Sequence, residues 1–104
     1  MYAVFYSFKV KPKQVKKFIK GWQGLTDLIY QYEGSLGSRL HKKGPFEYMA
    51  YAQWPSKNKF ESSGENLPEK ANEYRDLMRV SCEEIEVISK AEVVKDLLAD
   101  KLYD

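Results

Sequence analysis

The sequence is short of the residues that build metal sites and covalent active sites. Its 104 residues include one cysteine, Cys82, and one histidine, His41. A single cysteine excludes an intrachain disulfide and any metal site built from several cysteines. The sequence also has no glycine-rich phosphate loop, no zinc-ligand spacing and no Gly-x-Ser-x-Gly elbow. We therefore expect no bound metal and no cofactor.

Long apolar runs are absent as well. No segment approaches the roughly 18 apolar residues of a membrane-spanning helix, and no signal-peptide h-region follows Met1. These absences predict a soluble, cytoplasmic protein with no membrane partner. Aromatic residues, in contrast, make up 14% of the chain, which excludes a disordered tail. We expect one domain, residues 1–104, with a single core.

Charge is divided along the chain although its sum is only +2. Residues 1–60 hold eleven Lys and Arg against three Asp and Glu, whereas residues 61–104 hold six against twelve. A basic segment can bind nucleic acid or another anion. The pI near 8.6 is low for a nucleic-acid-binding domain. We expect instead that the two halves neighbour each other, within one fold or across a dimer.

Apolar periodicity divides the chain into strands and helices. Strands are predicted at residues 2–10, 35–42, 46–54 and 84–93, the middle two as a hairpin around Lys43-Gly44-Pro45. Helices are predicted at residues 13–32, 56–63 and 69–82, and a loose C-terminal arm or short helix at residues 94–104. The main order, βαββαβ, predicts a ferredoxin-like α+β fold: a four-stranded antiparallel sheet with its helices on one face.

The two central strands carry apolar residues on both faces. In strand 2–10, Tyr6 and Phe8 share one face and Phe5 lies on the other, and strand 46–54 alternates in the same way. Because the helices cover only one face, something else must cover the second. A second copy of the chain predicts a homodimer joined through its sheets. The alternative, an RNA-stacking platform, needs glycines and a basic lead that strand 46–54 lacks, so we expect no nucleic-acid partner.

Two short motifs and one aromatic residue carry a resemblance to a known family. Gly34-Ser35-Leu36-Gly37 opens the second strand, Tyr51-Ala52-Gln53-Trp54-Pro55-Ser56 closes the third, and Phe60 follows. Over residues 2–63 the chain thus resembles the antibiotic biosynthesis monooxygenase (ABM) superfamily. The resemblance implies a dimeric α+β barrel. It also implies oxidation of a phenol to a quinone by dioxygen, without metal or flavin, in an apolar cavity that stabilises the phenolate.

The functional residues of the family transfer to this chain only in part. The pocket Trp of the polyketide-type monooxygenases matches Trp54, but an Asn four residues earlier is Ala50 here. A Tyr six residues after that Trp is Phe60. The haem-degrading members place a ligating His in the second helix, where residues 69–74 contain none. The resemblance therefore implies no haem, and slow or undetectable turnover of polyketide-type substrates.

Three aromatic side chains are candidates for the walls of a substrate site. A pocket needs apolar walls and a few convergent polar groups. Trp22 lies on the apolar face of helix 13–32, and Trp54 and Phe60 lie in and after the third strand. We therefore expect a cavity between the sheet and this helix. Each of the three can equally be an ordinary core residue.

Tyr6, Tyr51 and His41 are the candidate catalytic residues. Each can exchange a proton or donate a hydrogen bond to a developing oxyanion. The alternatives are interface packing for the tyrosines and a solvated strand end for His41. Two functions stay open: a cofactor-independent monooxygenase acting on an aromatic or polyphenolic compound, and a non-catalytic binding or regulatory module with the same barrel.

Overall fold

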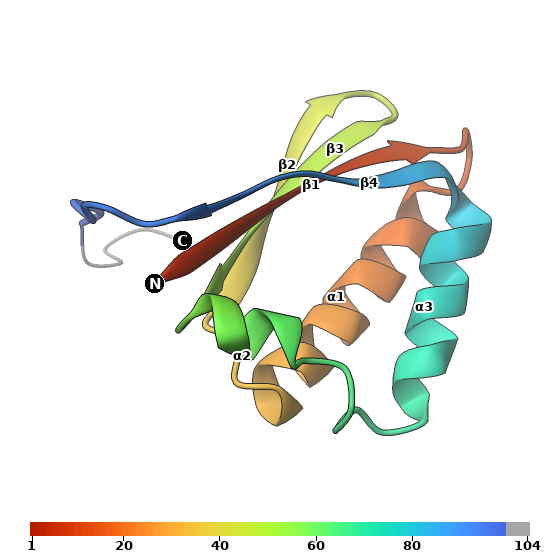
Figure 1. The fold of residues 1–104 in the computed structure, drawn as a ribbon. Helices are drawn as coiled ribbons and strands as arrows, with labels where there is room; N and C mark the ends of the chain where they lie inside the picture. Colours follow the sequence, from red (N-terminus) through yellow and green to blue (C-terminus); the bar gives the residue numbers. More distant parts are fainter. Residues whose placement is uncertain (100–104) are drawn as a thin grey trace.

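Four strands and three helices lie within residues 1–99, the part of the chain that the computed structural model describes. In chain order they are β1 (Tyr2–Val10), α1 (Val15–Tyr32), β2 (Gly37–Gly44), β3 (Glu47–Trp54), α2 (Lys57–Glu61), α3 (Lys70–Ser81) and β4 (Cys82–Glu92). Figure 1 shows one layer of strands with the helices beneath it. The predicted arm, 94–104, forms no helix up to residue 99, and residues 100–104 lie outside the described part.

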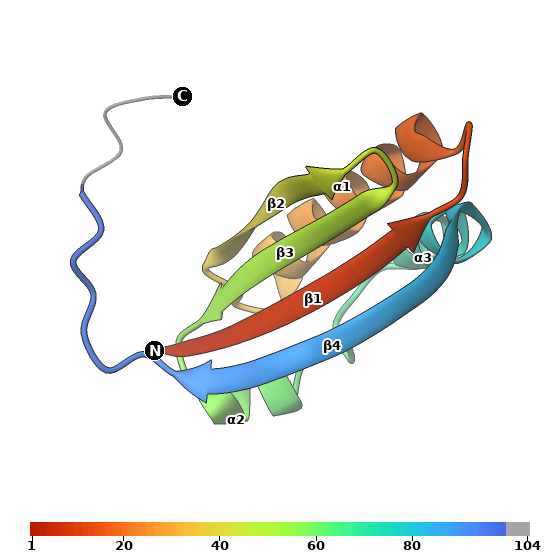
Figure 2. The same cartoon turned by 90° about the horizontal axis from the view of Figure 1, so that it is seen from above.

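The strands form one antiparallel sheet in the order β2-β3-β1-β4. Strands β1 and β3, which are not consecutive in the sequence, pair at its centre, and β2 and β4 form its edges (Figure 2). Helices α1 and α3 lie on the same side of the sheet (Figure 1). The predicted ferredoxin-like fold is therefore confirmed.

Alternation along the central strands sorts their side chains onto two faces. The helix face consists of Tyr2, Val4, Tyr6 and Phe8 of β1 and Tyr48, Ala50, Ala52 and Trp54 of β3. The open face consists of Ala3, Phe5 and Ser7 of β1 and Met49, Tyr51 and Gln53 of β3. The pairs Tyr6–Ala50 and Phe5–Tyr51 fix this division. Phe5, Met49 and Tyr51 stay half-buried because no helix covers them.

The core is centred on Phe18, a fully buried side chain of α1. Its ring lies 5.0 Å from that of Phe8 and 5.3 Å from that of Tyr48, measured between centroids. Tilted aromatic pairs of this kind contribute about 0.5–1.5 kcal/mol each beyond their burial. The amphipathic helix therefore docks on the sheet through its predicted apolar face. No helix in residues 1–99 is long and apolar enough to cross a bilayer.

Helices α1 and α3 approach closely where α1 has a glycine. A Cβ built on Gly21 would lie 2.9 Å from the backbone carbonyl oxygen of Tyr74 and 2.9 Å from Cγ of Met78. Only a residue without a side chain permits this approach without a shift of the backbone. The contact holds α3 beside α1, and it brings Arg75 and Met78 to the space between α1 and the sheet.

Several predicted boundaries were wrong by one or two residues, and strand pairing explains two of these differences. Strand β4 begins at Cys82 rather than at residue 84, because the chain enters the strand directly from α3 and Cys82 already pairs with Val10. Strand β2 continues to Gly44, past the start of the predicted turn, because an irregularity at Lys43 lets the ladder reach the Gly44–Glu47 pair. The start of β4 is set by pairing with a distant segment, and the end of β2 by pairing across the hairpin turn.

After β4 the chain leaves the sheet as an extended arm, residues 93–99. The Val93 N–H donates to the carbonyl of Met1 at 2.9 Å, which extends the β1–β4 ladder by one step. Beyond it, Val94, Leu97 and Leu98 are 95%, 83% and 72% exposed. Figure 2 shows the arm standing off from the end of the sheet.

Candidate active site

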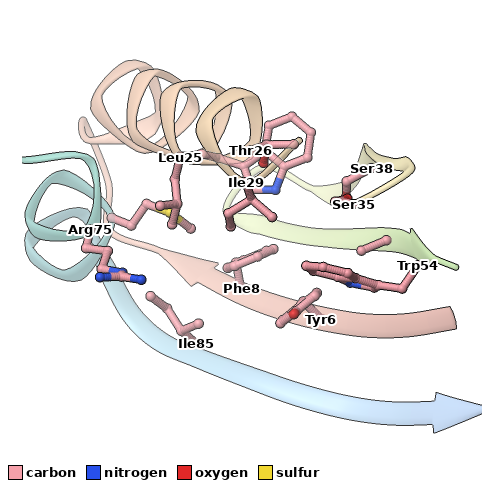
Figure 3. Close-up of a pocket in the computed structure, with 13 residues that line it drawn as sticks. Tyr6, Phe8, Leu25, Thr26, Ile29, Ser35, Ser38, Trp54, Arg75 and Ile85 are labelled. Atoms are coloured by element: carbon pink, nitrogen blue, oxygen red, sulfur yellow. The ribbon is translucent and has the colours of Figure 1, made fainter. Parts of the chain in front are cut away.

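A cavity of about 300 Å³ lies between α1 and the helix face of the sheet (Figure 3). Its apolar walls are Phe8, Trp22, Leu25, Ile29, Ala52, Trp54, Met78 and Ile85. Its polar groups are Tyr6, Thr26, Ser35, Ser38 and Arg75. Apolar walls with a few polar groups are typical of small-molecule sites.

Two of the three candidate wall residues line this cavity. Trp22 reaches it from α1, and Trp54 from the last position of β3. Phe60 of α2 does not line it but packs edge-on against the Trp54 indole, with a centroid separation of 5.6 Å. The Tyr2 ring packs against the Phe60 ring in turn, with a centroid separation of 5.9 Å. Phe60 therefore holds Trp54 in place from outside the cavity.

Tyr6 brings a phenol hydroxyl to the cavity from the middle of β1 (Figure 3). Burial raises the pKa of Tyr6 above its usual value, so at neutral pH the side chain is a hydrogen-bond donor. The hydroxyls of Ser35 and Ser38 instead donate to the backbone carbonyls of Gln53, at 3.4 Å, and Tyr51, at 2.9 Å. Among these three hydroxyls of the described residues, the Tyr6 hydroxyl is the one that is free to donate to a ligand.

Arg75 of α3 is the one charged side chain among the residues that line the cavity. It is exposed and lies beside Ile85 of β4, so it stands at the opening (Figure 3). This residue was not predicted from the sequence, although a signal existed. Ala71, Arg75 and Met78 recur at four- and three-residue steps, which places Arg75 on the same side of α3 as two buried residues. A guanidinium at an apolar opening favours an anionic group on the ligand.

The other two candidate catalytic residues lie on the open face. The Tyr51 ring packs against Phe5 at 5.2 Å, and its hydroxyl accepts a hydrogen bond from Gln53 Nε2 at 3.0 Å. His41 of β2 pairs with Met49 on the same face. Because the sheet stands between these residues and the cavity, they do not meet Tyr6 within one chain.

Ala50 occupies the position at which the family resemblance implies an Asn. It is 3% exposed and pairs with Tyr6 across β1 and β3, so a donor is missing beside the Tyr6 side chain. Cys82 offers no nucleophile, because burial raises the pKa of its thiol while Ser81 and Lys11 lower it by less. The described part of the chain holds no group of three or more His, Cys, Asp or Glu that could bind a metal ion.

The burial of Tyr6 predicts that stability depends on pH. Because its pKa is raised in the folded protein, the folded state keeps a proton that the unfolded state releases above about pH 10. The free energy of unfolding should therefore fall as the pH rises from about 9 to about 11. Tyr6→Phe removes the hydroxyl, so its urea midpoint should fall less over this range than that of the wild type. An equal fall of the urea midpoint with pH in the two proteins would contradict a buried Tyr6 hydroxyl.

Several solved structures share this fold at low sequence identity. One is a variant of SnoaB, a cofactor-independent oxygenase from Streptomyces nogalater, with 13% identity and a TM-score of 0.73 over 92% of this chain and 95% of that one. Proteins from Deinococcus radiodurans and Bordetella bronchiseptica that carry the name of antibiotic biosynthesis monooxygenases are also similar. The first has 8% identity and a TM-score of 0.74 over 96% of this chain and 99% of its own. The second has 19% identity and a TM-score of 0.69 over 90% of this chain and 97% of its own.

Family membership rests on the sequence itself. No curated protein sequence matches the chain. The sequence profile described as "Antibiotic biosynthesis monooxygenase" matches residues 1–66, which hold β1, α1, β2, β3 and α2. Since this match spans more than half of the sequence, the chain belongs to the antibiotic biosynthesis monooxygenase family.

Proposed function

We propose that the cavity between α1 and the sheet binds a phenolic aromatic compound and oxidises it with dioxygen, without a metal or bound cofactor. The composition of the cavity carries this proposal: largely apolar walls, a neutral phenol at Tyr6 and a single cation at Arg75. Apolar walls accept a flat aromatic body, the Tyr6 hydroxyl suits a ligand oxygen that becomes negative, and Arg75 adds a positive charge at the opening of the cavity. The similar SnoaB structure is named as a cofactor-independent oxygenase, which supports this reaction class.

Each polar group has its own role in the proposed reaction. Arg75 favours the ionised form of the ligand hydroxyl, and Tyr6 donates a hydrogen bond to the phenolate oxygen. The electron-rich ring then reduces dioxygen. One oxygen atom enters the ring as the new quinone oxygen, and the other leaves as water with the hydroxyl proton and the displaced ring hydrogen. The apolar walls keep bulk water away from the intermediate.

The expected rate is low because two polar groups of the family pattern are missing. Ala50 is buried and apolar, and Phe60 has no hydroxyl. One hydrogen-bond donor at an oxyanion site contributes on the order of 3 kcal/mol to the barrier. Turnover of polyketide-type phenols should therefore fall well below the roughly 1–1000 per second of typical enzymes.

The same two substitutions favour a second function, a module that binds the aromatic compound without turning it over. Ala50 cannot donate a hydrogen bond, and the Phe60 ring is engaged with Trp54 at 5.6 Å. Tyr6 and Arg75 would then serve recognition alone. Binding without quinone formation would identify this function.

Oxygen-dependent oxidation distinguishes the two functions. Fused-ring phenols and hydroquinones are incubated with the protein in air and under argon, and quinone absorbance is followed. A monooxygenase forms quinone from the phenols in air only, faster than the same solution without protein. Arg75→Gln should lower this rate about tenfold or more, because it removes the cation but keeps most of the side chain.

Arg79→Gln is the matched control for Arg75→Gln. Arg79 is exposed on the same helix, pairs with Asp76 and does not line the cavity. A surface pair of this kind contributes little to stability, so the control should behave like the wild type. Equal rates for Arg75→Gln and the wild type would contradict the role of Arg75.

The proposal extends to assembly and location. We expect two copies to pack through their open faces, because Phe5, Met49 and Tyr51 stay half-buried in a single chain. We also expect the protein in the cytoplasm, without a nucleic-acid partner. Light scattering at micromolar concentration tests the dimer, and a stable monomer would contradict it.

A further inference from the structure

The cavity is small, and its wall continues outside along β4. Its volume of about 300 Å³ is at the lower end of the roughly 300–1,000 Å³ of ligand sites. Ile85 of β4 lines the cavity and is nevertheless 47% exposed. A ligand that is larger than its aromatic body therefore has to leave the cavity past Ile85.

An apolar strip on the helix face of β4 lies beside this opening. Ile85 pairs with Phe8 and Val87 with Tyr6, so both aliphatic side chains share the face that the cavity occupies. Val87 is 47% exposed as well, whereas Phe8 on the neighbouring strand is 3% exposed. The strip lies on the opposite side of the sheet from the open face. Its exposed apolar surface suits an apolar part of a ligand.

Lys90 lies at the far end of this strip. It pairs with Val4, which places it on the same face of β4, beyond Val87 and past the irregularity in the strand. Its Nζ lies 5.8 Å from the centroid of the Phe60 ring, and that ring packs against the cavity wall at Trp54. The cation–π contact therefore holds the ammonium group close to the cavity but outside it.

The positive charge of Lys90 is not compensated by an ion pair within residues 1–99. One carboxylate lies near it, because Glu92 pairs with Tyr2 and follows on the same face of β4. In the described part of the chain these two side chains form no ion pair, and Lys90 lies over the Phe60 ring instead. An uncompensated ammonium group at the end of an apolar strip suits an apolar chain with an anionic end.

We propose that the helix face of β4 is a second subsite, in which Ile85 and Val87 bind an apolar arm of the ligand and Lys90 binds a carboxylate at the end of that arm. This inference rests on the proposed function and names the part of the ligand that lies outside the cavity. The strand partners of Val87 and Lys90, which are Tyr6 and Val4, are about 7 Å apart along β1. An arm of a few carbon atoms spans this distance. The subsite selects a phenol with an acidic arm over the bare phenol.

Arg75 is the other cation at the opening, beside Ile85 (Figure 3). It lines the cavity itself, where we assign it to the ligand hydroxyl, whereas Lys90 does not line the cavity. An arm that turned toward α3 would make carboxylate binding depend on Arg75 rather than on Lys90. Variants of the two residues distinguish these directions.

Three ligands with the same aromatic body test the subsite. They are a naphthol, the naphthol with a butyl arm and the naphthol with a carboxypropyl arm, each arm placed at several ring positions. Quenching of tryptophan emission under argon gives the Kd of each ligand without oxidation. At low salt, the best carboxypropyl isomer should bind about fivefold more tightly than its butyl counterpart, and high salt should reduce this difference. Lys90→Met keeps an unbranched side chain without the charge, so it should abolish the difference and leave the butyl ligand unchanged.

Three further variants serve as controls and as independent tests. Lys16→Met is the matched control, because Lys16 is an exposed lysine of α1 that does not line the cavity, and all Kd values should stay unchanged. Glu92→Gln removes the nearby carboxylate, so it should tighten binding of the carboxypropyl ligand alone. Val87→Ser makes the strip less apolar, so it should weaken both armed ligands about threefold and leave the bare naphthol unchanged.

The outcomes separate the subsite from the cavity. Absence of saturable quenching by all three ligands would overturn the proposed function and the subsite together. If the naphthol binds but no carboxypropyl isomer binds more tightly than its butyl counterpart, the subsite is wrong and the cavity stands. A difference that survives Lys90→Met and is lost in Arg75→Gln would overturn the role of Lys90. A difference that Lys90→Met removes and Lys16→Met preserves supports the inference.

Discussion

Trp54→Ala is expected to destabilise the fold by about 3–5 kcal/mol and to abolish ligand binding in the cavity. Trp54 is 4% exposed and forms a buried cluster with Tyr2, Val4 and Ala52. Its removal opens one wall of the cavity and takes away the ring against which Phe60 packs. Since domains are stable by only about 5–15 kcal/mol, the urea midpoint should shift strongly.

Trp54→Phe separates the effect on binding from the effect on folding. A phenyl ring keeps part of the wall, so this variant should stay folded and bind a phenolic ligand at least about tenfold more weakly. Tyr30→Ala is the control, because Tyr30 is a largely exposed aromatic residue of α1 that does not line the cavity. A Trp54→Ala protein as stable as the wild type would show that the indole is not part of a packed wall.

Ala50→Asn is expected to raise the rate of phenol oxidation about 100-fold while lowering stability. The amide would stand beside Tyr6 in the β1–β3 pairing, and one donor at an oxyanion site changes kcat by about 10²–10³. Stability should fall because the amide replaces a methyl group in the buried cluster that contains Phe8 and Tyr48. A buried amide without a full set of partners costs about 1–3 kcal/mol.

Ala50→Val is the matched control for the added donor. It adds bulk without a hydrogen bond, so it should lose stability and gain no activity. Quinone formation and urea unfolding are measured on the same preparations. Wild-type turnover of about 1–1000 per second would contradict the importance of Ala50, because another group would then supply the missing donor.

The fold could be predicted because local periods and tertiary packing agree in this chain. Val4, Tyr6 and Phe8 recur at every second position, and α1 presents Phe18 toward them at helical spacing. The start of β4 was less predictable, since it depends on a distant partner. Cys82 belongs to β4 only because Val10 lies opposite it.

The candidate site could be predicted only in part. Alternation shows which residues of one strand share a face if that strand carries no bulge, but the register between β1 and β3 decides whether Tyr6 and Tyr51 lie on the same face. The β1–β3 pairing runs without a bulge, with Tyr6 opposite Ala50 and Tyr51 opposite Phe5. Arg75 was not predicted as a site residue, because α3 is mostly exposed and carries several other charged residues. In such a helix a charged side chain usually faces the solvent.

The most direct test of the proposed site uses the two tryptophans of the chain, Trp22 and Trp54, because both line the cavity. A fused-ring phenol is titrated into the protein under argon, and tryptophan emission is corrected for absorption by the ligand. If the phenol binds in the cavity, the quenching should saturate. Thr26→Phe fills the cavity from α1, so it should weaken this binding at least about tenfold. Leu98→Asp on the arm should leave the quenching unchanged. No saturable quenching, or quenching that survives Thr26→Phe and is lost in Leu98→Asp, would contradict a binding site between α1 and the sheet.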